Sequence, residues 1–241
     1  MKHLDLFSGI GGFSLGLEAA GMETVAFVEN DEDCQSVLSR HWCDVPIYGD
    51  IKEVDFNEFE DIDIITAGFP CTDASTAQEY RTGTSGERTG LYREVVRAIR
   101  VVRPRYTIME NVAGLLDTGM GNVLGDLVEA GQDIEWDCIS ASDCGAPHER
   151  ERLWIVSNPA GERLPGSREC FKSIHKTPDA YREADSFVDA VQRNTLPFVC
   201  DRHDGVSRQV AESGLKQLGN SVVPQITYAI GKAIMEQEKA S

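Results

Sequence analysis

The order of apolar runs and glycine-rich turns is the feature that most restricts how this chain can fold. Short apolar runs that we expect to be strands occupy residues 3–7, 24–28, 61–67, 106–109, 134–141 and 153–156. Helical patterns lie between them at residues 13–20, 31–41, 91–102 and 122–130, and a last helix follows residues 219–221. This alternation predicts an α/β fold with a doubly wound, Rossmann-like, mostly parallel sheet.

The same pattern predicts one main domain with a small insert. The 241 residues are enough for a full α/β domain and little more. Residues 158–212 lose the alternation and are polar and interrupted by prolines, whereas residues 213–241 regain it. We therefore expect residues 1–157 to form the catalytic and cofactor-binding domain, and residues 213–241 to return to it after the insert.

The composition sets limits on location and on metal binding. We find no apolar run of membrane-spanning length and no signal-peptide pattern, so we expect a cytoplasmic protein without a membrane partner. The seven cysteines include no Cys-x-x-Cys pair. We therefore expect neither a disulfide framework nor a metal site.

The charge distribution is unusual for a protein that binds nucleic acid. The formal net charge is −17, and residues 1–80 contain 17 acidic and 3 basic side chains. Residues 81–110, in contrast, contain seven arginines and three acids, and a second group of arginines lies within residues 148–182. These two arginine islands flank the segments that carry the candidate reactive residues.

The glycine-rich stretch Ser8–Gly12 is a candidate cofactor loop. Such a turn between a strand and a helix is typical of nucleotide-type cofactor sites, although a plain tight turn has the same composition. Glu29 follows about 20 residues later, where an acidic side chain accepts hydrogen bonds from ribose hydroxyls. The surroundings contain Asp5, Asp31 and Asp50 and the loop has no lysine, which favours the sulfonium cation of S-adenosylmethionine over NAD or ATP.

Four side chains are candidates for a catalytic or substrate-binding role, and for each of them a purely structural role is the alternative. Cys71 lies in the aperiodic stretch 68–90, where a thiol is accessible, but it could be a small buried side chain. Glu110 follows an apolar run, so it could be a desolvated acid or an ordinary solvated carboxylate. Arg150 and Arg152 project from one face of a strand and could bind a base or phosphate or form surface ion pairs.

Five segments together resemble the DNA cytosine-C5 methyltransferase family, in the family's order. They are Asp5–Gly12, Gly68–Cys71, Glu110–Val112, His148–Arg152 and Gly219–Pro224. The resemblance implies methyl transfer from S-adenosylmethionine to C5 of a flipped cytosine in DNA, through a covalent bond between Cys71 and C6. It further implies that Glu110 hydrogen-bonds N3 and the exocyclic amine of the base, and that Arg152 holds O2.

The resemblance also implies a set of site residues. The catalytic residues would be Cys71, Glu110, Arg150 and Arg152. The cofactor-binding residues would be Phe7, Ser8, Gly9, Gly11, Gly12, Glu29, Asn30, Asp50, Ile51, Pro70, Asn220 and Ser221. The expected DNA contacts in the arginine islands are Arg81, Arg88, Arg163 and Arg168, with Arg93 and Arg97 as further candidates, although Arg97 could equally cover the surface of its helix.

Departures from the family pattern leave alternatives open. Thr72 and Ala74 follow the expected nucleophile where the family often has Gln and Phe, and His148 stands where it has Gln. The insert at 158–212 is short for a DNA target-recognition region. A tRNA cytosine-5 methyltransferase and a catalytically inactive DNA-binding homologue are the alternatives. We expect double-stranded DNA as substrate, a monomer, and a cognate restriction endonuclease as a candidate partner.

Overall fold

A seven-stranded sheet forms the centre of the molecule. The computed structural model describes residues 1–70, 91–144, 149–161, 171 and 220–240. The strands are β1 (Lys2–Leu6), β2 (Glu23–Val28), β3 (Ile47–Tyr48), β4 (Ile64–Ala67), β5 (Tyr106–Val112), β6 (Gln132–Ser140) and β7 (Glu151–Pro159). Their order across the sheet is β3-β2-β1-β4-β5-β7-β6.

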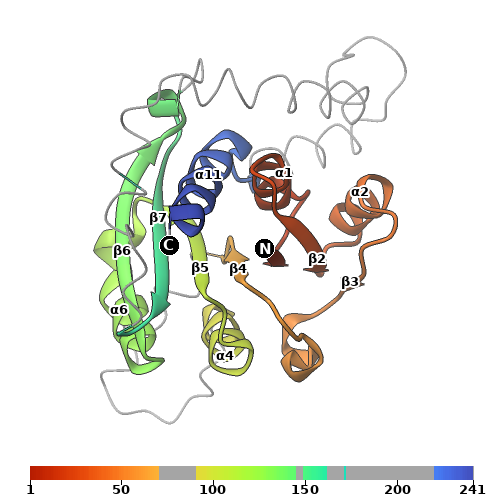
Figure 1. Ribbon diagram of the computed structural model, residues 1–241, viewed down its shortest axis with the longest axis horizontal. Coiled ribbons are helices and arrows are strands. Elements are labelled where there is room, and N and C mark those ends of the chain that lie inside the picture. The colour runs from red at the N-terminus through yellow and green to blue at the C-terminus, as the bar shows by residue number, and fades with distance from the viewer. Residues whose placement is uncertain (71–90, 145–148, 162–170, 172–219, 241) are drawn as a thin grey trace.

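Helices cover both faces of this sheet, as Figure 1 shows. The α-helices are α1 (Gly12–Ala19), α2 (Glu32–His41), α4 (Tyr92–Val102), α5 (Leu115–Thr118), α6 (Met120–Glu129) and α11 (Pro224–Ala240). Short 3-10 helices are η1 (Ile51–Glu53), η2 (Phe56–Glu58) and η4 (Ala141–Cys144). Helices α1 and α11 pack side by side on one face, and α4 lies on the other. Within the described part of the chain, no helix is both long and apolar enough to cross a membrane.

The predicted doubly wound fold is confirmed by the five strands on one side of the sheet. Strands β3, β2, β1, β4 and β5 are parallel to one another. The chain winds outward from β1 in one direction to β3, then returns to the opposite side of β1 with β4. In such sheets the carboxyl ends of the strands at this reversal form the ligand crevice. The topology therefore predicts a ligand crevice at the loops that follow β1 and β4.

The other two strands run antiparallel to their neighbours. β7 pairs with β5 on one side and with β6 on the other. The connection from β6 to β7 spans only residues 141–150, which is too short for the crossover that parallel neighbours need. The pairing with β7 also extends β5 to Val112, so Glu110 and Asn111 lie inside the strand and not beyond the end that was predicted at residue 109.

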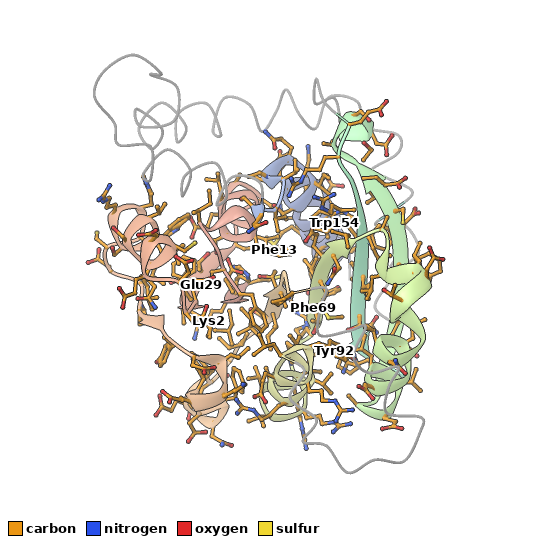
Figure 2. All side chains as sticks on the ribbon, turned by 180° about the vertical axis from the view of Figure 1, so that it is seen from behind. Lys2, Phe13, Glu29, Phe69, Tyr92 and Trp154 are labelled. Atoms are coloured by element: carbon orange, nitrogen blue, oxygen red, sulfur yellow. The ribbon has the colours of Figure 1, made fainter. Side chains whose placement is uncertain are left out.

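Two hydrophobic clusters hold the layers together. Side chains alternate along β1, so that Leu4 and Leu6 face α4 while His3 and Asp5 face α1. On the α1 and α11 side, the rings of Phe13 and Trp154 pack edge to face with centroids 5.9 Å apart. Figure 2 shows these two residues on the same side of the sheet. The clusters fix α1 and α4 on opposite faces, with the crevice at the carboxyl edge between them.

Candidate active site

The carboxyl ends of five parallel strands bring most of the described candidate residues to one edge. The glycine-rich loop Phe7–Gly12 follows β1, Glu29 follows β2, and Asp50 comes two residues after β3. Residues Gly68–Pro70 follow β4, and Glu110 lies near the carboxyl end of β5, where it pairs with β7. Residues far apart in the sequence thus meet where α/β sheets bind ligands.

The loop after β1 is tightly folded and strained. Phe7 and Gly9 have φ angles of 53° and 55°, and Gly11 has 88°, all in the left-handed region. The Ser8 hydroxyl donates to the Asp5 carbonyl oxygen at 2.7 Å, and the Gly11 amide donates to the Ser8 carbonyl at 2.9 Å. A non-glycine residue in this region costs on the order of 1–3 kcal/mol, and such strain is concentrated at functional sites.

The three glycines of the loop have different neighbours. A Cβ added to Gly9 would meet no atom within 4 Å, so space is open beside it. A Cβ on Gly11 would lie 2.7 Å from the Trp42 ring, and one on Gly12 would lie 2.6 Å from the carbonyl oxygen of Val222. The packing of Trp42 and of the segment before α11 is therefore sufficient reason for Gly11 and Gly12, and their predicted contact with a cofactor stays a prediction.

Glu29 fastens the glycine-rich loop to the end of β2. Its Oε2 accepts the Gly9 amide at 2.7 Å and its Oε1 accepts the Asp31 amide at 2.8 Å. Each carboxylate oxygen has a second lone pair, so the half-buried group can still accept hydroxyl donors. Asn30 is exposed beside it, and Figure 2 shows Glu29 at the margin of the sheet.

Asp5 is a buried side chain that links elements of the fold. It was counted among the acids that make the surroundings of the cofactor loop negative, and its side chain is fully buried under α1. It accepts hydrogen bonds from Ser14 at 2.7 Å and Thr66 at 2.8 Å, and Thr66 is also 2.7 Å from His3 Nε2. Burial raises the pKa of Asp5 to about 7 and lowers that of His3 to about 3. This polar chain ties β1 to α1 and β4, and the raised pKa reduces the negative charge that Asp5 contributes near neutral pH.

Asp50 and Ile51 form the turn that follows β3. The Asp50 carboxylate is exposed and accepts the Lys52 amide at 3.0 Å, which caps η1. The Ile51 side chain is buried and its carbonyl oxygen accepts a bond from Arg97. Arg97 was a candidate DNA contact, with cover of its own helix surface as the alternative; its guanidinium donates to the backbone of the segment after β3, and its side chain is 37% exposed.

Glu110 is a buried acid paired with an arginine. Its side chain is 11% exposed, and its Oε1 lies 3.1 Å from Arg152 Nε. Burial raises the pKa of Glu110 to about 7, although Arg152 and then Arg150 lower it. At neutral pH the group therefore exists in both protonation states, so it can donate a proton as well as accept one.

Arg150 and Arg152 lie on the same face of the chain, as their alternation predicted. Arg150 Nη2 donates to the Ser221 carbonyl oxygen at 2.9 Å, which joins the segment before α11 to the site. Burial and the neighbouring Arg152 lower the pKa of Arg150 from its ordinary value. Arg152 on β7 forms an ion pair with Glu110 on the neighbouring strand β5. This pair disfavours the alternative in which the two arginines form surface ion pairs with Glu149 and Glu151.

Asn111 is a site residue whose individual role was not anticipated. It is buried, and its Nδ2 donates to the Phe69 carbonyl oxygen at 2.9 Å. The Phe69 ring packs against Tyr92 with centroids 5.2 Å apart, and Figure 2 shows both on the α4 side of the sheet. These contacts fix the chain just before Cys71. The only signal in the sequence was the position of Asn111 beside Glu110.

Other candidate residues lie outside the part of the chain that the structure describes. They are Cys71, Thr72, Ala74, Arg81, Arg88, His148, Arg163 and Arg168. Most of the predicted insert at 158–212 is also outside it, but residues 158 and 159 pair with β6 and belong to the sheet. Pro70 and Asn220 are described and exposed. Within the described ranges, no group of three or more His, Cys, Asp or Glu side chains is placed to hold a metal ion.

The chain is similar to proteins that modify DNA. Residues 1–197 match the family model described as C-5 cytosine-specific DNA methylase. The Type II methyltransferase M.CviJI of Paramecium bursaria Chlorella virus IL3A is 40% identical over 159 residues, which are 65% of this chain and 42% of that protein. The Type II methyltransferase M.AquIA of a Picosynechococcus strain is 33% identical over 183 residues, which are 67% of this chain and 73% of that protein.

The fold is also similar to that of a solved methyltransferase structure. A prophage-encoded protein of E. coli, described as a DNA modification methyltransferase, superposes with a TM-score of 0.58 at 26% identity and covers 71% of this chain and 50% of its own. The chain thus spans about half the length of most of the relatives it matches.

Proposed function

The chain belongs to the C-5 cytosine-specific DNA methylase family, and from this premise we propose that it methylates C5 of a flipped cytosine in double-stranded DNA, with S-adenosylmethionine as donor. The observation that carries the proposal is the buried pair of Glu110 and Arg152, 3.1 Å apart, beside the backbone that leads into Cys71. A buried acid with a pKa near 7 next to a guanidinium suits a base that must gain a hydrogen bond or proton during the reaction.

The residues around the glycine-rich loop fit the cofactor. Open space beside Gly9 leaves room for a ligand against the loop. Glu29 can accept ribose hydroxyls, and Glu29, Asp31 and Asp50 together give a negative environment that suits a sulfonium cation and disfavours a pyrophosphate. We propose that Phe7, Gly9, Glu29, Asp50 and Ile51 hold it. When bound, S-adenosylmethionine supplies an electrophilic methyl group on positively charged sulfur.

The reaction needs an activated ring, because cytosine C5 is a weak nucleophile. In the proposed mechanism the Cys71 thiolate forms a bond to C6, and the electrons of the C5–C6 double bond move to C5. Glu110 hydrogen-bonds N3 and the exocyclic amine and offsets the charge that builds on the ring, while Arg152 holds O2. After C5 accepts the methyl group, a base removes the C5 proton, the C5–C6 double bond re-forms and the Cys71 sulfur leaves.

The DNA partner follows from the chemistry. C6 is inaccessible in a stacked duplex, so the target cytosine has to be flipped out of the helix. We propose that the region 158–212 contacts the DNA around it, with Arg163 and Arg168 on that side and Arg81 and Arg88 on the other. Several relatives are named Type II methyltransferases, so we also propose a cognate restriction endonuclease in the same host.

A methyl-transfer assay with labelled S-adenosylmethionine tests this function directly. We expect incorporation into duplex DNA of mixed sequence and none into tRNA. Incorporation into tRNA alone would identify the tRNA cytosine-5 methyltransferase alternative. DNA binding without incorporation into either substrate would identify an inactive homologue.

A further inference from the structure

Arg97 on α4 donates to one neighbouring segment through two of its nitrogens and pairs with Glu94 of its own helix through the third. Its Nη2 donates to the Ile51 carbonyl oxygen at 2.7 Å and its Nη1 donates to the Val54 carbonyl oxygen at 3.0 Å. Its Nε pairs with Glu94 at 2.6 Å, and its guanidinium carbon lies 4.4 Å from the centre of the Phe56 ring. A planar fork that binds two carbonyls while it stacks on a ring is a geometry that only arginine provides.

The segment that Arg97 holds has few strong bonds of its own. Residues Asp50–Asp55 contain the single 3-10 turn η1 (Ile51–Glu53), after which the Val54 amide reaches the Ile51 carbonyl only at 3.4 Å. Two shorter hydrogen bonds fix the start of the turn. The Glu53 amide donates to the Asp50 carbonyl oxygen at 2.9 Å, and the Lys52 amide donates to the Asp50 carboxylate. The Ile51 and Val54 side chains are buried, but burial is not directional and does not set the orientation of a peptide plane.

The position of this segment connects it to the candidate cofactor site. The Glu29 amide donates to the Tyr48 carbonyl at 2.9 Å, so the ends of β2 and β3 are joined directly. Asp50 follows two residues later at the same edge of the sheet as Glu29. Arg97 therefore holds the turn that follows β3, at the edge of the sheet where the cofactor is proposed to bind.

We propose that Arg97 is a positioning residue for cofactor binding, which holds the Asp50–Ile51 turn in the shape that contacts S-adenosylmethionine. The inference rests on the proposed function, because it assumes that this turn contacts that cofactor. It also gives one arginine of the first arginine island a role within the domain, while the Arg97 side chain keeps 37% of its surface exposed. Arg97 does not touch the reacting atoms, so it acts through the turn.

The test compares Arg97→Lys with Arg100→Ala. Lysine keeps the charge and much of the stem but cannot bind both carbonyls and cover the Phe56 ring. Arg100 is an exposed arginine on the same helix, so Arg100→Ala also removes an arginine from α4 without touching the turn. We expect Arg97→Lys to weaken binding of S-adenosylhomocysteine, measured by calorimetry, by about tenfold or more, as the loss of a charged hydrogen bond implies. Arg100→Ala should bind it like the parent.

Two further readouts separate positioning from general stabilisation. Amide hydrogen exchange of the free protein should be at least about tenfold faster in the peptide containing Asp50–Asp55 and unchanged in a peptide from α11. The kcat of Arg97→Lys at saturating cofactor should match the parent, with the loss confined to the KM for S-adenosylmethionine.

The outcomes are distinct. Parent-like affinity and exchange in folded Arg97→Lys would overturn the inference while leaving the proposed function intact. Faster exchange throughout the protein, or failure of both Arg97→Lys and Arg97→Gln to fold, would mean that Arg97 is only structural and would also overturn it. If the parent protein binds no S-adenosylhomocysteine and transfers no methyl group, the proposed function fails, and this inference fails with it.

Discussion

Replacing Glu110 with glutamine removes an ionisable proton and almost nothing else. The side chain is 11% exposed and lies 3.1 Å from Arg152 Nε, and a glutamine carbonyl can still accept that bond. The variant therefore isolates the acid from the shape of the site. General acid catalysis by a positioned group contributes about 10²–10⁴-fold, which corresponds to about 3–5 kcal/mol of activation free energy. We expect Glu110→Gln to lose at least about 10²-fold in kcat while S-adenosylmethionine affinity stays unchanged.

The pH dependence gives this prediction a second, independent readout. Burial raises the pKa of Glu110 to about 7, so the protonated form declines as pH rises through 7. The parent kcat should therefore fall above about pH 7, and Glu110→Gln should lack that decline. Stability follows the same sign: because the folded pKa lies above the ordinary 4.5, protonated Glu110 stabilises the fold at low pH, and this contribution is lost as pH rises through 7.

Single-turnover methyl transfer to duplex DNA over a series of pH values measures the rate, and calorimetry measures cofactor affinity. Glu236→Gln, an exposed position on α11, is the matched control. The reasoning about Glu110 is refuted if its glutamine variant loses cofactor affinity in parallel with rate, or if the alkaline decline of the parent persists unchanged in the variant.

Three further predictions concern other parts of the account. DNA containing 5-fluorocytosine should trap a covalent adduct that mass spectrometry places on Cys71, because fluorine blocks the final elimination; an adduct on any other residue contradicts the mechanism. Asn111→Ala leaves the buried Phe69 carbonyl without its donor, so denaturant unfolding should show a loss of about 1–3 kcal/mol, and methyl transfer should slow without a change in cofactor binding. The parent should show a slope of log affinity against log salt of about −3 to −5, and Arg163→Ala with Arg168→Ala should make it shallower by about 1–2; an unchanged slope would remove region 158–212 from the DNA interface.

The parallel half of the fold was predictable from sequence because its signals are local. The helix predicted from residue 31 is present, and Asp31, a residue type that favours this position, caps it by accepting the Asp33 and Cys34 amides. The α4 helix from Tyr92 to Val102 follows the predicted range closely. The antiparallel direction of β6 and β7 was not predicted, because strand direction depends on which partner a strand finds and not on its own pattern.

The site was predictable in its residues but less so in their roles. Motif order identified Glu110 and Arg152, yet only the structure gives their 3.1 Å contact. The sequence gives no sign that a Cβ on Gly11 would lie 2.7 Å from the ring of Trp42, about 30 positions later, while the predicted cofactor contact of Gly11 stays a prediction. The sequence counts Asp5 among the acids near the cofactor loop and Arg97 among the candidate DNA contacts, whereas in the structure Asp5 is fully buried and Arg97 donates to the Ile51 carbonyl oxygen. Long-range contacts of this kind leave no periodic signal.

Methylation of DNA cytosine at C5 through Cys71 can be measured in living cells. The chain and its Cys71→Ala variant would be expressed in a bacterial host without cytosine-C5 methylation of its own, and the host DNA sequenced for 5-methylcytosine. We expect 5-methylcytosine in a short fixed sequence context with the parent chain and none with Cys71→Ala. Absence of 5-methylcytosine from DNA with the folded parent chain, or its persistence with Cys71→Ala, would rule out the proposed reaction.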